Sequence, residues 1–365
     1  MKRSIDTPFL LVLCALLVFG LLIFTSAALG LLARDGATFT SVAVSQLLLG
    51  FLCGSIALLV LSRLDYRKLR PYTPYFFAFA LGLTALTFVP GIGLELKGAS
   101  RWIAIGSFSF QPEEVLKLAT VAFLAAVYAA RFRTLNTWRG GIVPLIGIGG
   151  SAAALLFLQP ATDGAAIILL TSAIMLYVAG GRVSHLAVLV CLGVLAVGVA
   201  VYERPYLAER FETYWQQGAA DPRGAGWQIQ QSLIAVGSGG LTGRGFGQSI
   251  EKFSYLPEPI GDSIFAVAAE EFGFVGSLAL VSLYVGFAML GLRIAARAAD
   301  PFGGLLVIGL VILIVGQSFM NIASTLGLIP VSGLPLIFVS HGGTALAIAL
   351  AEVGLILSVS RRMKS

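Results

Sequence analysis

The residue best placed to do chemistry is a carboxylate, Asp262, at the point where a long polar segment meets a long apolar run. A carboxylate at such a boundary can act as a general base or hold a divalent cation. It can equally cap the N-terminus of the helix that follows. The residue type and its place leave these three interpretations open.

A second group of charged residues stands around a proline that suits the first turn of a helix, Pro112. Glu114 and Lys117 are three residues apart and therefore share one helix face, with Lys117 about one turn inside an apolar run. They can form an ion pair that only holds the protein together, or they can face a polar cavity. Arg101, beside Trp102, can be an interfacial anchor or can join Lys117 in a cationic site suited to phosphate.

Further polar residues interrupt the apolar runs nearer the C-terminus. Glu270, Glu271 and Glu352 fall inside apolar segments, where carboxylates serve either as proton relays or as hydrogen-bonding partners within a bundle. A glycine-rich stretch, 237–247, permits tight turns but lacks the spacing of a nucleotide-binding loop. The proline and glycine punctuation of 328–344 predicts a bent, re-entrant segment.

Composition decides which elements can position these residues. Of the 365 residues 58% are hydrophobic and only 12% are charged, too few charges to cover a soluble globule of this size. The long unbroken apolar runs predict an all-α, polytopic membrane protein and argue against a β-barrel. We expect a single integral-membrane domain over residues 1–365 with ten spans: Pro8–Leu32, Val42–Ser62, Tyr75–Val89, Glu113–Ala130, Ile142–Leu158, Gly164–Gly180, Leu186–Tyr202, Asp262–Leu292, Phe302–Thr325 and Gly343–Ser360.

The placement of Lys and Arg predicts the orientation. Most of the 24 Lys and Arg residues lie at the two termini and in the even-numbered connections, which places both termini in the cytoplasm. The segments 91–112, 326–342 and the long loop 203–261 between spans 7 and 8 then face outward together. Topology accounts for the net charge of +6, so no nucleic-acid partner is expected. His341 and His185 fall on opposite sides, which excludes a metal site built from the two histidines.

Five ordered stretches resemble the SEDS family of bacterial cell-wall glycosyltransferases (FtsW, RodA and SpoVE). They are 98–102, 108–117, 231–247, 252–276 and 328–344, and within the family they are more similar to FtsW than to RodA. The resemblance implies that Asp262 matches the family's catalytic carboxylate and that Arg101, Glu114 and Lys117 match its supporting charged residues.

The sequence departs from the family pattern at four places. Ile260-Gly261-Asp262-Ser263 replaces His-Thr-Asp-Phe, and Glu113 replaces the serine of Gln-Pro-Ser-Glu. In 159–164 the aspartate of Gln-Pro-Asp-Leu-Gly-Thr is lost or displaced to Asp163, and His341 stands in place of a tyrosine. These changes leave open a diverged activity and the details around Asp262.

The resemblance implies polymerisation of lipid II into glycan strands at the outer face of the bacterial cytoplasmic membrane, in cell division or elongation. Asp262 would be the catalytic base or a ligand of Mg or Mn, with Arg101, Lys117, Glu114 and Trp102 binding the pyrophosphate or supporting it. The implied partners are a class B penicillin-binding protein transpeptidase and other divisome or elongasome membrane proteins. The alternatives are a flippase for lipid-linked sugars and a non-catalytic scaffold that recruits a transpeptidase.

Overall fold

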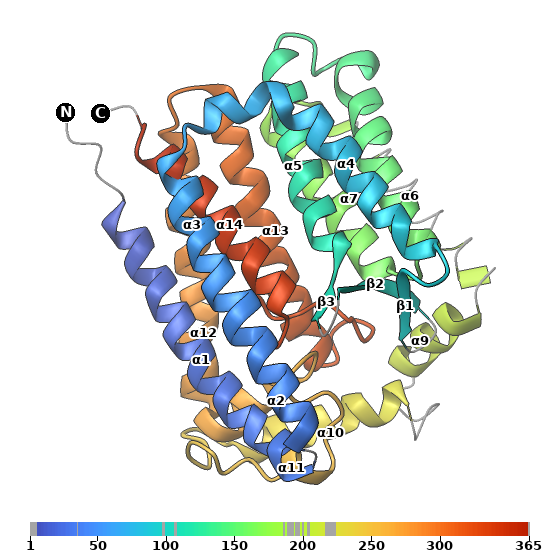
Figure 1. The fold of residues 1–365 in the computed structure, drawn as a ribbon, viewed down its shortest axis with the longest axis vertical. Helices are drawn as coiled ribbons and strands as arrows, with labels where there is room; N and C mark the ends of the chain where they lie inside the picture. The colour runs from blue at the N-terminus through green and yellow to red at the C-terminus, as the bar shows by residue number, and fades with distance from the viewer. Residues whose placement is uncertain are drawn as a thin grey trace.

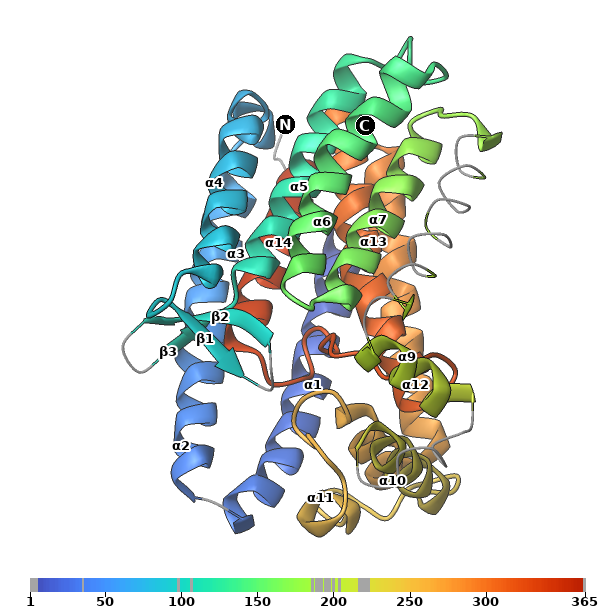
Figure 2. The ribbon, with the colours of Figure 1, turned by 90° about the vertical axis from the view of Figure 1, so that its right-hand side faces the viewer.

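The computed structural model is a bundle of long helices, with a small sheet near the middle of its length and several short helices at one end (Figures 1 and 2). The structure describes residues 6–34, 36–96, 99–105, 108–184, 187, 193, 198, 201–202, 205–215 and 224–363. Its elements are α1 Thr7–Arg34, α2 Gly36–Val44, η1 Ser45–Cys53, α3 Gly54–Arg63, η2 Tyr66–Tyr72, α4 Thr73–Ala85, η3 Leu86–Phe88, β1 Gly93–Leu96, β2 Ala99–Ile105, β3 Phe108–Phe110, α5 Pro112–Ala130, η4 Trp138–Ile142, η5 Leu145–Gly150, α6 Ser151–Leu158, α7 Thr162–Val178, α9 Pro205–Trp215, α10 Ala225–Ser238, α11 Glu251–Ser254, α12 Ile264–Ala296, α13 Pro301–Thr325 and α14 Gly343–Ser360.

Every predicted span except the seventh corresponds to helix in the structure. Among the described residues six helical stretches are long and apolar enough to cross a membrane, and α7 is a shorter apolar helix. The seventh predicted span, Leu186–Tyr202, and its His185 and Cys191 neighbourhood lie almost entirely outside the described residues. The chain is therefore a multi-pass helical membrane protein.

The prediction of an entirely helical chain is wrong in one segment. Residues 93–110 form a three-stranded antiparallel sheet in the order β1-β2-β3, in which Trp102 of β2 pairs with Leu94 and Ile103 pairs with Phe110. The strands are only a few residues long, and their backbone groups pair with one another within this small sheet. This sheet holds Arg101 and leads directly into α5.

The helices pack closely where small residues face one another. α14 packs along α3, and a Cβ added at Gly354 or Gly54 would press against the facing helix. α12 packs between α1 and α13, with the Phe9 and Phe287 rings 4.8 Å apart. Small residues allow such close approach in membrane proteins, where burial of apolar surface gives little driving force between helices.

The end of the bundle that carries both termini is rich in basic residues. Both termini lie at one end (Figure 1), together with the basic connections at residues 63–72 and 131–139. At this end Asp300 caps α13 through the Gly303 N–H at 3.0 Å and pairs with Arg67 Nε at 3.0 Å. The sheet, α10, α11 and the segment before α14 lie toward the other end (Figures 1 and 2).

Candidate active site

Asp262 lies in the turn that leads into α12. Its backbone carbonyl accepts hydrogen bonds from Asn321 Nδ2 at 3.0 Å and from Thr325 Oγ1 at 3.2 Å, both on α13. The residue at the N-cap of α12 is Ser263, and no side-chain hydrogen bond caps that helix. The structure therefore does not support the interpretation of Asp262 as the N-cap, and two α13 side chains fix its backbone instead.

Three charged side chains from distant parts of the chain meet around Gly333. Its N–H donates to Asp163 Oδ2 at 3.0 Å. A Cβ built on Gly333 would lie 3.8 Å from Arg101 Nη1, 3.8 Å from Asp163 Oδ2 and 4.0 Å from Asp262 Oδ2. Gly333 belongs to the segment 328–344, whose proline and glycine pattern predicts a re-entrant turn. Because Gly333 has no side chain, room remains between one cation and two carboxylates.

Hydrogen bonds with two side chains, Gln46 of η1 and Tyr284 of α12, fix the backbone of the segment 328–344. The Gly342 N–H donates to Gln46 Oε1 at 3.0 Å, and Gln46 Nε2 donates to the Ser340 carbonyl at 3.3 Å. The Tyr284 hydroxyl of α12 donates to the Ile337 carbonyl. Because non-helical backbone in a bundle must have its polar groups satisfied, these contacts explain how the segment can run beside the helices.

Arg101 reaches this site from β2. Its guanidinium donates to the Pro160 carbonyl, just before α7, while its Nε is buried without a hydrogen-bond partner among the described residues. The Ser332 hydroxyl, next to Gly333, is buried and unpartnered in the same sense. These two donors lie near one another and are available to a ligand. Leu94 pairs with Trp102 and Glu95 pairs with Ser100, so Arg101 is the extra residue of a bulge in β2.

The predicted pair of Glu114 and Lys117 is present at the start of α5. Lys117 Nζ lies 2.8 Å from Glu114 Oε1, and the lysine is fully buried. A second carboxylate, Glu113, lies 3.7 Å from the same Nζ. Glu113 is also within electrostatic range of Arg101 and Asp163, so it joins the lysine to the site around Gly333.

Glu113 occupies a place that a neighbouring glycine leaves open. A Cβ on Gly164, the residue after Asp163, would overlap the Glu113 carboxylate. The glutamate at position 113, which replaces the family's serine, therefore fits because position 164 in the segment 159–164 is a glycine. Asp163 of that segment reaches the Gly333 N–H from the first turn of α7.

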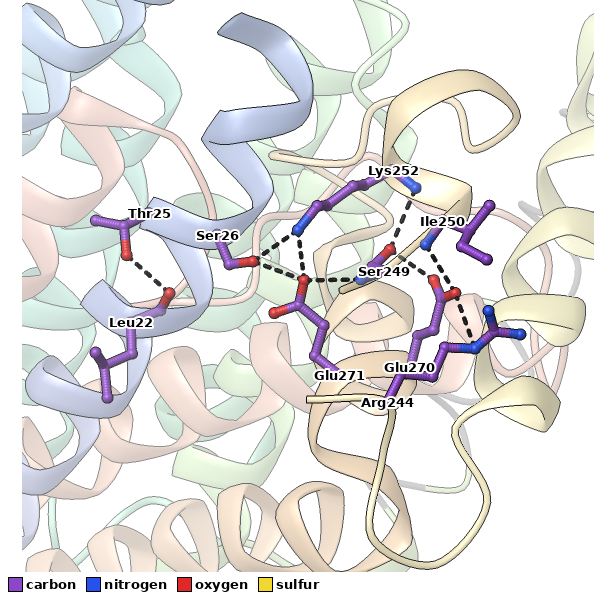
Figure 3. Close-up of polar contacts among 9 residues, drawn as sticks. All are labelled: Leu22, Thr25, Ser26, Arg244, Ser249, Ile250, Lys252, Glu270 and Glu271. Carbon is purple, nitrogen blue, oxygen red and sulfur yellow. Dashed lines mark hydrogen bonds and ion pairs between the residues drawn. The ribbon is translucent and has the colours of Figure 1, made fainter. Parts of the chain in front are cut away.

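A second buried ionic network ties the outer loop to the bundle (Figure 3). Lys252 Nζ lies 2.6 Å from Glu271 Oε1 and donates to Ser26 Oγ of α1 at 2.8 Å, and Ser26 Oγ donates to the same carboxylate oxygen at 2.6 Å. Ser249 Oγ donates to Glu270 Oε2 at 2.6 Å. The Glu270 and Glu271 carboxylates therefore serve as hydrogen-bonding partners within the bundle, which anchor the segment that leads to Asp262.

The glycine-rich stretch packs on a kink in α12. Gly273 has φ 65° inside that helix, and the N–H groups of Arg244 and Gly245 donate to the Glu270 and Glu271 carbonyls, each at 3.0 Å. A Cβ at Gly243 would strike the Glu271 carbonyl, so the backbones touch directly. These glycines serve close packing, and the N–H groups of Arg244 and Gly245 are used within the protein.

His341 lies apart from the charged site, with its ring stacked on Phe24 at 6.4 Å between centroids. Its backbone N–H donates to the Ile260 carbonyl at 2.7 Å. Within the part of the chain that the structure describes, no group of three or more His, Cys, Asp or Glu side chains could hold a metal ion. Asp163 and Asp262 are two carboxylates near one point, enough for a Mg²⁺ that takes its remaining ligands from a substrate.

Sequence reasoning missed Asp163 and Gly333 as members of the site. Asp163 does not align with the family aspartate, so the motif alone hid it. The signal that could have found it is its position as a carboxylate in the first turn of an apolar helix, where such a group needs a partner.

Comparison with known proteins gives one consistent group of relatives. The family model described as a cell cycle protein, which covers FtsW, RodA and SpoVE, matches residues 7–365. Stage V sporulation protein E of Bacillus subtilis (strain 168) is 39% identical over 311 residues, 84% of this chain and 84% of that protein. A probable peptidoglycan glycosyltransferase FtsW of Geobacter sp. (strain M18) is 34% identical over 365 residues, 98% of this chain and 97% of that protein.

Two solved structures share the fold. A chain of a peptidoglycan synthase complex, described as coordinating polymerization and crosslinking, has a TM-score of 0.80 and 28% identity, with 98% of each chain covered. The crystal structure of the rod shape determining protein RodA of Thermus thermophilus has a TM-score of 0.71 and 27% identity, covering 98% of this chain and 97% of that one. The overall fold of this chain is therefore one that solved structures already contain.

Proposed function

This chain belongs to the FtsW/RodA/SpoVE family of cell cycle proteins, and on that premise we propose that it is a peptidoglycan glycosyltransferase that polymerises lipid II. The observation that carries the proposal is the meeting of Arg101, Asp163 and Asp262 around Gly333. Four separate segments bring a cation, two carboxylates and an open space to one place. Such an arrangement suits a substrate with a charged leaving group and a hydroxyl that must lose a proton.

The reaction joins two lipid-linked sugars. The bond between the donor's anomeric carbon and its pyrophosphate breaks, and a bond to the acceptor's sugar oxygen forms. Asp262 takes the proton of that hydroxyl as the general base. Its backbone is held by Asn321 and Thr325, which fixes where the carboxylate can reach.

Arg101 binds the pyrophosphate that leaves. Its planar guanidinium can hold two phosphate oxygens, and its buried Nε has no partner among the described residues. Lys117, paired with Glu114, supplies a second positive charge deeper in the bundle, and Glu113 couples it to Arg101. Stabilising the charge that develops on a leaving group is a principal source of catalysis. Trp102 supports the strand that carries Arg101.

As the alternative to acting as the base, Asp262 would hold a divalent cation, Mg or Mn, together with Asp163. The cation would supply charge neutralisation on the leaving group. Mg²⁺ commonly binds through one or two carboxylates together with substrate phosphates, which the two aspartates around Gly333 support.

The protein works in the bacterial cytoplasmic membrane with its site toward the outer face. One relative's structure is titled as a complex that coordinates polymerisation with crosslinking, and crosslinking is the reaction of a transpeptidase. We therefore propose a class B penicillin-binding protein transpeptidase as the partner, with other divisome or elongasome membrane proteins. The family's description as cell cycle proteins supports a role in cell division at the septum, with elongation as the alternative.

The test is incubation of the purified protein with labelled lipid II, alone and with a transpeptidase whose own active site is inactivated. We expect glycan strands to form, with the transpeptidase as an activator. A flippase would move lipid II between leaflets of vesicles without lengthening it. A scaffold would bind the transpeptidase and leave lipid II unchanged, so either result would contradict the proposal.

A further inference from the structure

A groove separate from the site around Gly333 lies at the end of the bundle that carries both termini. It has a volume of about 400 Å³ and is lined by residues of η2, α4 and α5: Arg70, Pro71, Thr73, Pro74, Phe123, Ala126, Val127, Ala130 and Arg131. Its floor is apolar, and the described residues that line it include two arginines and no acid. We propose that this groove binds the headgroup and upper chains of an anionic glycerophospholipid of the cytoplasmic leaflet.

The walls of the groove come from two helices that touch deeper in the bundle. α4 packs along α5, and the Phe77 and Phe123 rings lie 5.5 Å apart. Beyond that contact, toward the helix ends, the groove lies between the two helices, with Val127 and Ala130 of α5 on one side and Pro74 of α4 on the other. An apolar recess between spans that opens at their ends has the form needed for the glycerol and the first carbons of the acyl chains.

Exposed aromatic side chains place the groove at the depth of lipid headgroups. Tyr72 and Tyr75, each directly after one of the groove's prolines, are 65% and 74% exposed. Trp138 and Phe132, in the connection after α5, are 58% and 61% exposed. Aromatic side chains concentrate at membrane interfaces, so the arginines beside them lie at the level of the lipid phosphates.

Both arginines are held before any lipid binds. The Arg70 guanidinium lies 6.0 Å from the centre of the Phe302 ring, and the Thr73 hydroxyl donates to the Arg70 carbonyl at 2.9 Å. Arg131 Nη1 donates to the Arg139 carbonyl at 3.2 Å, which leaves its other N–H groups to donate outward. Preordered cations lose less entropy on binding, and basic pockets between spans on this side of a membrane bind anionic headgroups.

The experiment uses the full-length protein in detergent, with phosphatidylglycerol or phosphatidylcholine titrated and bound lipid counted by native mass spectrometry. We expect phosphatidylglycerol to bind more tightly. Changing both groove arginines, Arg70→Gln with Arg131→Gln, should weaken its binding about tenfold or more. The matched control, Arg293→Gln with Arg297→Gln, removes the same charge from the cytoplasmic end of α12, outside the groove, and should change binding less than twofold.

A third variant separates the groove from its charge. Ala130→Trp fills the recess and keeps both arginines, and it should weaken phosphatidylglycerol binding as strongly as the loss of the arginines. Equal losses in the two arginine pairs would show that the basic face attracts lipid without a site, which overturns the proposal. Unchanged binding by Ala130→Trp would also overturn it, and elution as a single monodisperse peak establishes that each variant is folded.

Discussion

Replacing Lys117 by methionine should destabilise the protein more than replacing Glu114 by glutamine. Lys117 is fully buried and faces two carboxylates, Glu114 at 2.8 Å and Glu113 at 3.7 Å. Without the lysine both carboxylates remain buried with less compensation. Without the Glu114 charge, Lys117 still has Glu113 beside it.

The magnitudes follow from what each change leaves behind. Breaking a buried ion pair by removing one partner costs about 3–5 kcal/mol, chiefly because the other charge stays buried. Lys117→Met should lie near the upper part of that range, and Glu114→Gln below it. The double variant, Glu114→Gln with Lys117→Met, leaves one buried carboxylate, Glu113, where Lys117→Met leaves two, so it should be more stable than Lys117→Met.

Two measurements on each variant separate stability from activity. The fraction of protein that remains monodisperse after heating reports stability, and conversion of labelled lipid II to glycan strands reports activity. If Lys117 supplies charge to the leaving pyrophosphate, the double variant is folded but inactive. Near-normal polymerisation by the double variant would refute a role for Lys117 in the reaction. A Lys117→Met protein as stable as the parent would show that Lys117 does not stabilise the buried carboxylates beside it.

Three further changes test other parts of the site and the topology. Gly333→Ala puts a methyl group in ordinary contact with the three charged side chains, so the variant should fold normally. Its polymerisation rate should fall at least about tenfold, because displacements of about 1 Å at a reacting site are costly. Undiminished activity would contradict the placement of substrate there. Arg101→Ala should remove most turnover and Arg101→Lys should recover only part, because lysine lacks the planar fork for two phosphate oxygens; full activity of the lysine variant would argue against bidentate binding. In a background without native cysteines, Leu241→Cys, at a position 72% exposed, should react with an impermeant maleimide added outside, whereas Phe132→Cys should react only from the cytoplasm, and the reverse pattern would overturn the orientation.

The spans were predictable because each is a long apolar run that needs no partner to be identified. The sheet at 93–110 was not, since its strands have three to seven residues and pair only with one another. Neither Arg101 nor Trp102 belongs to a pattern that distinguishes a strand from a polar loop. Their local order comes from pairing across the sheet, which a single segment does not reveal.

The charged site was predictable in part. Asp262, Arg101, Glu114 and Lys117 stood out as ionisable groups at the edge of apolar runs, and the Glu114–Lys117 spacing alone indicated their pairing. The roles of these residues remain predictions. The meeting at Gly333 depends on contacts between segments more than 160 residues apart, such as Gly333 with Asp163, which no local pattern encodes.

The outer loop shows the same limit. Ser249 lies in the polar segment 203–261, yet its side chain is buried against Glu270. A polar segment predicts exposure, but this one folds back on the α12 kink at Gly273. Burial there results from the long-range ion pair of Lys252 with Glu271.

The most direct test of the proposed activity compares Asp262→Asn with the parent protein in the lipid II polymerisation assay, with the same inactivated transpeptidase present. The substitution keeps the shape of the side chain and the backbone bonds to Asn321 and Thr325, so the variant should fold, insert and bind the transpeptidase as the parent does. Loss of a general base costs roughly 100-fold to 10,000-fold in rate, so glycan strands should fall below detection. Glycan synthesis by the folded Asp262→Asn protein at a rate near that of the parent would contradict the account.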